Sequence, residues 1–186
     1  GLVAIFAGST GFNGEFTLAD AGTTLTGVSA GDKAGETLPV VGDVNNDGTD
    51  DLAVGAPHAD GIDIDGGAIY LFNSLPNGQA SLSQANTIFE GFYLNEQAGT
   101  STASGDFNND GQTDLAIGSP HSPWGGNDAG TVGVFYGPIA SGAFVTNSAP
   151  VRYFGTTMNF DAGQSLSRTD LNNDGTDDLA VGMSCQ

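Results

Sequence analysis

The chain repeats one short stretch, which appears first at residues 43–55 as DVNNDGTDDLAVG. It returns at residues 106–118 as DFNNDGQTDLAIG and at residues 170–182 as DLNNDGTDDLAVG. Each copy has oxygen-bearing side chains at positions 1, 3, 5 and 9 and a glycine at position 6. Alternate residues can turn their oxygens toward an ion, while glycine allows the sharp bend that such a loop needs. The pattern predicts calcium loops at residues 43–51, 106–114 and 170–178.

Five residues of each loop are the predicted calcium ligands, four through side chains and the residue at position 7 through its backbone carbonyl. They are Asp43, Asn45, Asp47, Thr49 and Asp51; Asp106, Asn108, Asp110, Gln112 and Asp114; and Asp170, Asn172, Asp174, Thr176 and Asp178. Oxygen ligands in this number favour calcium over magnesium, which demands a tighter octahedral cage. We expect about three calcium ions per chain. The alternative is a metal-free Asn/Asp/Gly turn, which leaves three matched carboxylate sets unexplained.

Two other families of metal loop are excluded by the residues after each loop and by the spacing of the copies. An EF-hand loop closes with Glu at position 12 and leads into a helix. Here position 12 is Val54, Ile117 or Val181, within an apolar run. A dockerin-like module repeats its loop at a much shorter interval than the 63 and 64 residues that separate these copies.

Composition limits the partners. The 186 residues contain 3 Lys and Arg against 22 Asp and Glu, for a formal charge of −19. No basic patch can form to meet phosphates, so nucleic acid and anionic membrane surfaces are poor partners, and no apolar run approaches the length of a membrane span. The single cysteine, Cys185, cannot form an internal disulfide and is either an inert thiol or a bond to another chain.

The loops belong to a longer repeat. Short runs rich in Val, Ile, Tyr and Phe keep the same period, and no stretch carries a helical apolar stripe. Each period then holds four strands, and four-stranded antiparallel units at a fixed long period are the signature of a β-propeller. We predict twelve strands, at residues 2–7, 15–18, 37–42, 51–55, 67–73, 86–90, 99–105, 114–118, 130–136, 150–154, 163–168 and 178–182.

The expected fold is therefore an all-β propeller domain over residues 1–186 with three blades' worth of strands, fewer than the usual four to eight blades. Three arrangements are compatible with this number: two chains in a six-bladed ring, a fragment of a larger propeller, or a small array. We favour a homodimer or larger assembly, or a fragment, because a three-bladed arc would expose apolar faces. Residues 1–18 would complete the end blade by pairing beside residues 163–182.

The segments Phe154-Gly155 and Gly55-Ala56-Pro57, together with the Asp-x-Asn-x-Asp-Gly-x-x-Asp loops, resemble FG-GAP repeats. These repeats are the blades of the N-terminal propeller of integrin α chains and of many secreted proteins. The second copy has Gly118-Ser119-Pro120 and the third has Gly182-Met183-Ser184 at the place of Gly-Ala-Pro. The resemblance implies calcium on one face and ligands on the other face or the rim. It also implies a secreted or cell-surface module for adhesion or recognition of a protein or carbohydrate, although a few family members occur beside catalytic domains.

A few residues outside the loops are further candidates. His58 and His121 occupy equivalent places in two repeats, where a structural hydrogen bond is favoured over a shared zinc site. Trp124, the only tryptophan, either covers a blade edge or stacks on a sugar or a partner's side chain. Tyr93 and Tyr153 are weaker candidates for the same role.

Catalysis has little support in the sequence. There is no Gly-x-Ser-x-Gly elbow, no His-Glu-x-x-His and no Gly-rich phosphate loop with Lys. Two alternatives to a recognition module stay open. One is a hydrolase acting on glycans through a carboxylate pair, although nothing in the sequence singles out such a pair. The other is a purely structural propeller that assembles with itself.

Overall fold

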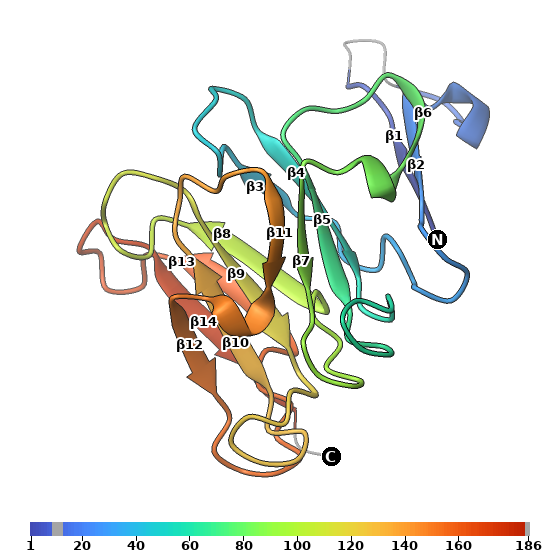
Figure 1. The fold of residues 1–186 in the computed structure, drawn as a ribbon. Helices are drawn as coiled ribbons and strands as arrows, with labels where there is room; N and C mark the ends of the chain where they lie inside the picture. The colour runs from blue at the N-terminus through green and yellow to red at the C-terminus, as the bar shows by residue number, and fades with distance from the viewer. Residues whose placement is uncertain (9–12, 185–186) are drawn as a thin grey trace.

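The computed structural model describes residues 1–8 and 13–184 and consists mainly of β-strands (Figure 1). Cys185 lies outside the described residues. The only helical elements among them are three-residue turns, so none has the length and apolar character of a membrane-crossing helix. The strands are β1 (Leu2–Ile5), β2 (Thr23–Thr26), β3 (Val40–Gly42), β4 (Asp51–Ala56), β5 (Ala68–Phe72), β6 (Gly78–Ser81), β7 (Thr87–Glu90), β8 (Ser101–Gly105), β9 (Asp114–Ser119), β10 (Thr131–Phe135), β11 (Gly142–Val145), β12 (Val151–Phe154), β13 (Ser165–Thr169) and β14 (Asp178–Gly182).

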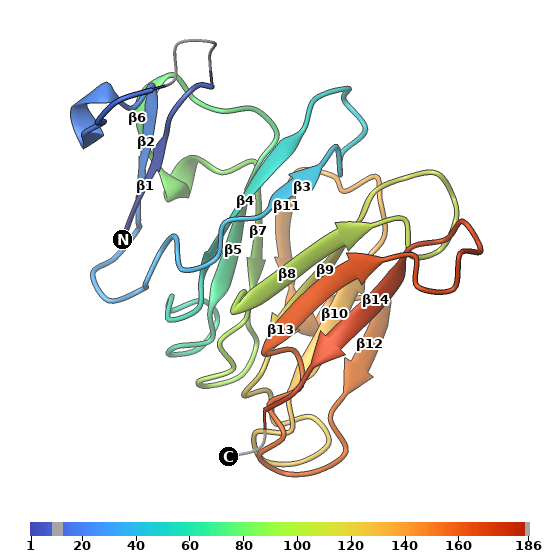
Figure 2. The same cartoon turned by 180° about the vertical axis from the view of Figure 1, so that it is seen from behind.

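The strands form two full blades between two half-blades, which lie on opposite sides of the molecule (Figures 1 and 2). The first full blade has the antiparallel order β3-β4-β5-β7 and the second has β8-β9-β10-β12. β1 and β2 form the first half-blade, and β13 and β14 form the second. The registers repeat, since Leu52 faces Phe72 in one blade and Leu115 faces Phe135 in the next. The predicted all-β fold of four-stranded blades is confirmed.

Each full blade also contributes one strand to the sheet of the blade before it. The sequence did not predict this pairing between blades. The connection between the third and fourth strands of each full blade contributes one extra strand to the blade before it. β6 pairs in parallel with β2, and β11 pairs in parallel with β7. The outer strands β2 and β7 thereby have backbone partners on both sides, which ties each blade to its predecessor.

The strand predicted at residues 15–18 is wrong. Residues 15–17 have no regular secondary structure, Leu18 begins a 3-10 turn at Leu18–Asp20, and the strand itself lies later, at β2. The Asp20 carboxylate accepts hydrogen bonds from the backbone and the hydroxyl of Thr17, both at 2.8 Å, which favours a capped turn. When the repeats are aligned, residues 14–17 correspond to β6 and β11 of the full blades. Among the described residues they have no preceding blade to pair with, and this explains the missing strand.

The two ends of the chain do not share a blade within residues 1–8 and 13–184. β1 pairs with β2, whereas β13 pairs with β14, and no ladder joins the two pairs. The expected pairing of residues 1–18 beside residues 163–182 is therefore not formed within one chain. Each half-blade keeps an unpaired strand edge.

The hydrophobic core lies between the blades. Ile69, Leu71 and Phe89 of the first full blade pack against the second full blade in one cluster. A second cluster joins the first half-blade to the first full blade, and a third joins the second full blade to the second half-blade. Phe89 is central because its ring contacts Phe135 at 4.7 Å and Phe144 at 5.3 Å between centroids. Stability therefore depends on each blade having a neighbour.

We predict that Phe89→Ala lowers the free energy of unfolding by about 3–5 kcal/mol, because it leaves a cavity where three aromatic rings meet. This is a large part of the roughly 5–15 kcal/mol typical of a domain. Ile64→Ala, at a loop side chain that is 61% exposed, is the control and should change stability by less than about 0.5 kcal/mol. Urea unfolding in calcium-containing buffer measures both, and equal losses would contradict the inter-blade core.

Candidate metal centre and recognition surface

Each predicted calcium loop connects the first two strands of a blade. The loops join β3 to β4, β8 to β9 and β13 to β14, at one end of the strands. Their backbones match, because position 4 has a positive φ of about 60° in all three, at Asn46, Asn109 and Asn173. The glycine at position 6, such as Gly48 with φ +90°, takes a conformation that other residues rarely adopt. The sequence thus folds three near-identical turns.

The loop side chains converge on the turn in the same way in every copy. In the first loop Asp43 accepts hydrogen bonds from the backbone N–H of Asp47 at 2.9 Å and of Gly48 at 2.8 Å. Asn45 accepts a second bond from Asp47 N–H and donates its amide to the Asp47 carboxylate at 2.8 Å. The loops that begin at Asp106 and Asp170 repeat all four contacts.

The aspartate at position 5 is exposed, and its carboxylate accepts a hydrogen bond from the backbone N–H at position 7. A hydrogen bond from the Thr49 hydroxyl lowers the pKa of Asp47. The pKa of Asp174 is also lowered, chiefly by a bond from the Thr176 amide. These carboxylates are therefore stabilised in their charged form, as ligands for a cation must be.

The aspartate at position 9 is buried in the first two loops, as Asp51 and Asp114. Burial raises the pKa of the Asp51 carboxyl, and the negative charges of Asp47 and Asp43 add to the rise. A hydrogen bond from Val44 N–H to Asp51 Oδ2, at 2.9 Å, acts in the opposite direction. Burial likewise raises the pKa of Asp114. Keeping these buried groups charged beside other carboxylates requires a compensating positive charge.

One buried oxygen points to where that charge would sit. Asp51 Oδ1 is buried and has no hydrogen-bond partner in the described part of the chain, whereas Asp114 Oδ1 accepts a bond from Gly137 N–H at 2.9 Å. The donor set of each loop is made only of oxygens, which suits calcium. Within residues 1–8 and 13–184, no three Asp, Glu, His or Cys side chains are arranged as a ready metal cluster. The loop carboxylates would therefore turn from backbone N–H groups toward an ion.

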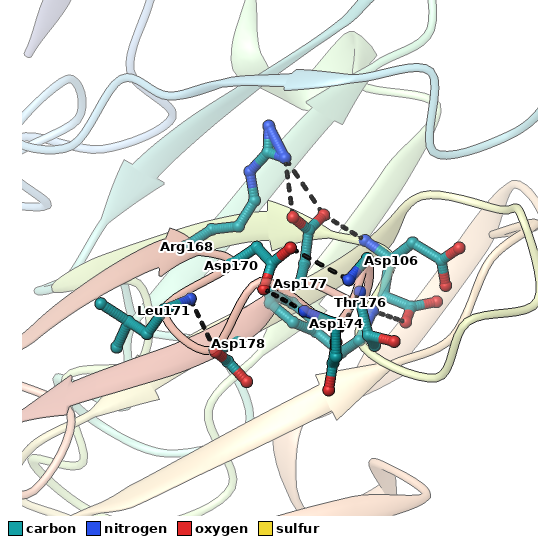
Figure 3. Close-up of polar contacts among 11 residues, drawn as sticks. Asp106, Arg168, Asp170, Leu171, Asp174, Thr176, Asp177 and Asp178 are labelled. Carbon is teal, nitrogen blue, oxygen red and sulfur yellow. Dashed lines mark hydrogen bonds and ion pairs between the residues drawn. The ribbon is translucent and has the colours of Figure 1, made fainter.

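The second and third loops are linked by a residue that the sequence analysis left unassigned. Asp177, at position 8 of the third loop, accepts a hydrogen bond from Asp106 N–H at 2.9 Å (Figure 3). Arg168 Nη1 lies 3.0 and 3.1 Å from the two oxygens of the same carboxylate. Asp106 is the first residue of the second loop, so this contact fixes the two loops side by side. The contact crosses between blades, which is why loop spacing alone did not reveal it.

The structure gives His58 a hydrogen bond with a neighbouring aspartate, as we predicted in preference to a zinc site. Its Nδ1 lies 3.2 Å from Asp65 Oδ1, within the loop between β4 and β5. The backbone N–H of His121 donates to the Glu96 carbonyl at 3.3 Å. Each histidine is thus tied to the loops around its own blade junction.

Four aromatic side chains form a continuous row, the aromatic ladder, consisting of Phe92, Tyr93, Trp124 and Phe154. The ring centroids are 4.9 Å apart for Phe92 and Tyr93, 6.2 Å for Tyr93 and Trp124, and 5.7 Å for Trp124 and Phe154. Its first three members lie in connections at the strand ends opposite the calcium loops. Trp124 and Phe154 remain 39% and 40% exposed. The structure thus brings together Tyr93 and Trp124, two of the three predicted stacking residues.

Polar groups hold the ladder in place. The Arg152 guanidinium lies 5.2 Å from the Trp124 ring centroid and 5.6 Å from that of Phe154. Buried Glu96 accepts the backbone N–H groups of Phe92 and Tyr93, at 2.8 and 2.9 Å. Sequence reasoning missed Arg152 because Trp124 comes from another connection, and it missed Glu96, whose other carboxylate oxygen accepts a hydrogen bond from the Thr146 hydroxyl of another turn. Rings presented at fixed angles beside a cation can stack on a sugar face or on a partner's side chains.

Tyr153, the third stacking candidate, does not join the ladder. It follows Arg152 on β12 and faces the opposite side of the sheet, where it lines a groove beside β14. Its side chain is 53% exposed.

The comparison with protein families agrees with this architecture. The FG-GAP repeat family matches residues 34–72 and 98–135, which hold the first two loops with β3–β5 and β8–β10. The chain therefore carries FG-GAP repeats, and its structure is that of a propeller fragment built from them.

The chain is also similar to two kinds of curated protein. It is 38% identical over 120 residues to phosphatidylinositol-glycan-specific phospholipase D of Homo sapiens, covering 63% of this chain and 14% of that protein. It is 33% identical over 136 residues to the Dictyostelium discoideum protein of the same name, covering 69% and 14%. It is 34% identical over 149 residues to integrin alpha-IIb of Mus musculus, covering 76% and 14%. The chain thus spans about a seventh of the length of these relatives.

The link between loops predicts different effects for two substitutions of Asp177. Asp177→Ala removes the acceptor for Asp106 N–H and should lower the free energy of unfolding by about 1–2 kcal/mol. Asp177→Asn keeps an oxygen acceptor and loses only the ion pair with half-exposed Arg168, which is worth about 0.5 kcal/mol. Urea unfolding of both variants in one calcium-containing buffer gives the comparison. Equal losses would mean that the hydrogen bond to Asp106 contributes nothing.

Proposed function

We propose that this chain is a calcium-stabilised propeller module of an extracellular protein, and that it recognises a protein or carbohydrate partner. Calcium is structural in this proposal and binds in the three loops. The observation that carries it is Asp51, a buried carboxylate whose Oδ1 has no hydrogen-bond partner in the described residues. This oxygen stands at the position that would close the shell of an oxygen-only loop.

The physical role of the ion follows from the position of each loop between two strands. Three aspartates and an asparagine are drawn into one turn, and without a cation their like charges oppose the turn. An ion among them would favour the paired strands over the unfolded chain, because the unfolded chain has no formed site. Extracellular modules bind calcium with dissociation constants of about 10⁻⁴–10⁻³ M, so we expect an affinity in this range if the protein is extracellular.

Calcium should therefore raise the melting temperature. One site at 100 times its dissociation constant contributes about 2.7 kcal/mol, which corresponds to roughly 5–10 °C for a chain of this size. Melting is followed by circular dichroism with EDTA, with calcium and with magnesium, and Asp51→Asn should reduce the rise due to calcium. Equal melting temperatures with EDTA and with calcium would refute calcium binding.

The aromatic ladder is the surface that we assign to recognition. Its rings lie at the strand ends opposite the loops, so a partner would not compete with calcium. Lys33 pairs with Glu36 and Arg168 pairs with Asp177, whereas the described structure shows no carboxylate paired with Arg152. A partner with an apolar ring face and an acceptor group, such as a sugar or an aromatic-rich peptide, suits this combination.

Trp124→Ala should abolish binding to the partner, because it removes the ring that connects Tyr93 to Phe154 in the ladder. The wild-type chain is first tested on arrays of oligosaccharides and of extracellular matrix proteins, with calcium present. Trp124 is the only tryptophan, so its fluorescence should shift when a ligand from the array is added in solution. Leu94→Ala, at an exposed residue near the ladder, is the control and should bind normally. Unchanged binding by the Trp124→Ala variant would move recognition to another surface.

A hydrolase is the second candidate, favoured only by the name of the phospholipase D relatives. The similarity covers 14% of those proteins in the two examples above, so their activity is not assigned to this chain. The loop aspartates are already committed to the turns. We therefore place any catalytic activity of a longer protein outside this propeller segment.

A further inference from the structure

The junction between the two full blades differs in chemistry from the junction that precedes it in the chain. Both of its sides are complete four-stranded sheets, β3-β4-β5-β7 and β8-β9-β10-β12, so neither side lies at an end of the chain. Aligned positions can be compared because the backbone contacts repeat. Gly67 N–H donates to the Ala59 carbonyl at 2.9 Å, and Gly130 N–H donates to the Ser122 carbonyl at 3.1 Å. The earlier junction, between the first half-blade and the first full blade, is therefore an internal reference.

Four positions that are apolar at the earlier junction carry hydroxyl groups at this one. At the earlier junction the four side chains belong to the hydrophobic cluster that joins the two sheets. The aligned pairs are Ala56 and Ser119, Ala59 and Ser122, Ala68 and Thr131, and Leu82 and Thr146. All of these side chains are buried, and the most exposed, Thr131 and Thr146, reach only 5%. The fold thus accepts apolar residues at these positions, and packing alone does not explain the hydroxyl groups.

Two of the buried hydroxyl groups have no partner. Ser122 Oγ and Thr131 Oγ1 lack a hydrogen bond within residues 1–8 and 13–184, and the Ser122 side chain is 0% exposed. The Thr146 hydroxyl, in contrast, donates to Glu96 Oε1 at 3.1 Å. A buried hydroxyl without a partner lowers stability. Residues that break the rules of a stable core are expected where a protein binds a ligand.

The unpartnered hydroxyl groups lie next to the aromatic ladder. Thr131 pairs with Ser119 on one side and with Phe154 on the other. Side chains of directly paired residues share one face of a sheet, so this row of three ends at a ring of the ladder. Ser122 directly precedes a residue that lines a hollow of about 260 Å³. The residues that line this hollow are Tyr93, Pro123, Trp124 and Gly125.

The charged groups of the junction are held by a single turn. Arg152 Nη1 donates to the Asn147 carbonyl at 2.9 Å, and the Thr146 hydroxyl holds the Glu96 carboxylate. Asn147 and Thr146 both belong to the 3-10 turn Thr146–Ser148. Glu96 in turn accepts the backbone N–H of Tyr93 at 2.9 Å. Groups that are fixed before a ligand arrives lose less conformational freedom on binding.

We propose that this junction binds a carbohydrate. The inference rests on the recognition function proposed above and names its partner class, a sugar rather than a protein. A sugar ring has an apolar face that can stack on Trp124 or Phe154, and hydroxyl groups at its edge. Those groups would exchange hydrogen bonds with Ser122 and Thr131 through ordered water, while the Arg152 guanidinium, which only donates, would meet a sugar oxygen.

The size of the hollow favours the same class of partner. Its volume of about 260 Å³ is close to the lower end of pockets for small ligands, which hold a few polar groups among apolar walls. A stable interface with a folded protein instead buries about 800 Å² on each side, with its polar groups at the rim rather than at its centre. Buried hydroxyl groups behind exposed rings match the first arrangement.

The test grafts the residues of the earlier junction into this one. The double variant Ser122→Ala with Thr131→Val removes both unpartnered hydroxyl groups and should keep or raise the melting temperature. It should weaken sugar binding by roughly 5- to 30-fold, because the hydrogen bonds through water are lost. Ala59→Ser is the matched control. It adds a hydroxyl group at the earlier junction, so it should lower the melting temperature and leave sugar binding unchanged.

Binding is measured by the fluorescence of Trp124 in calcium-containing buffer. The probes are methyl glycosides and oligosaccharides of glucose, galactose, mannose and N-acetylglucosamine, with the matrix proteins of the array for comparison. Melting by circular dichroism verifies that each variant is folded. Binding of a matrix protein but of no sugar overturns this inference and leaves the recognition function standing, whereas binding of neither overturns both. Unchanged sugar affinity in the double variant, or an equal loss in Ala59→Ser, also overturns the role of the hydroxyl groups.

Discussion

The crowding of carboxylates in the loop between the first two strands is the constraint on which the rest of the structure depends. Two like charges about 4 Å apart repel by roughly 1–4 kcal/mol between bulk water and a protein surface, and each loop draws three aspartates into one turn. Backbone N–H groups hold two of them in the first loop, as Asp43 and Asp47, whereas Asp51 is buried. The hairpin that begins each blade therefore depends on how this charge is balanced.

The blades built on these hairpins are stable only beside one another. Apolar side chains occupy the space between sheets, and the exchanged strands β6 and β11 add backbone pairing across the same boundaries. At the junction of the two full blades Phe135 and Phe144 cover the ring of Phe89, whereas Tyr153, at the matching place of the next blade, stays 53% exposed. The predicted calcium loops and the aromatic ladder lie at opposite ends of the strands, so stability and recognition would use different residues in the function that we propose.

The period and the loops could be predicted from sequence because their signals are local: oxygens at alternate positions, a glycine at the bend and apolar runs between turns. The strands β6 and β11 could not, because GQAS and GAFV become strands only by pairing with another blade. Residues 15–18 show the converse, since an alternating pattern that predicts a strand forms none there. Asp177, Arg168 and Glu96 also escaped prediction, because each contacts a residue from another turn or strand, which for Glu96 is Thr146. The calcium ligand sets themselves remain predictions.

The most direct test of the account is the number of calcium ions bound per chain. Isothermal titration of the calcium-free chain, checked by equilibrium dialysis, measures this number without reference to stability or to any partner. The account predicts about three ions per chain, as the three matching loops imply, and a loss of about one when Asp114 is replaced by Ala. A chain that binds no calcium at millimolar concentration, or keeps its full number after that substitution, would contradict it.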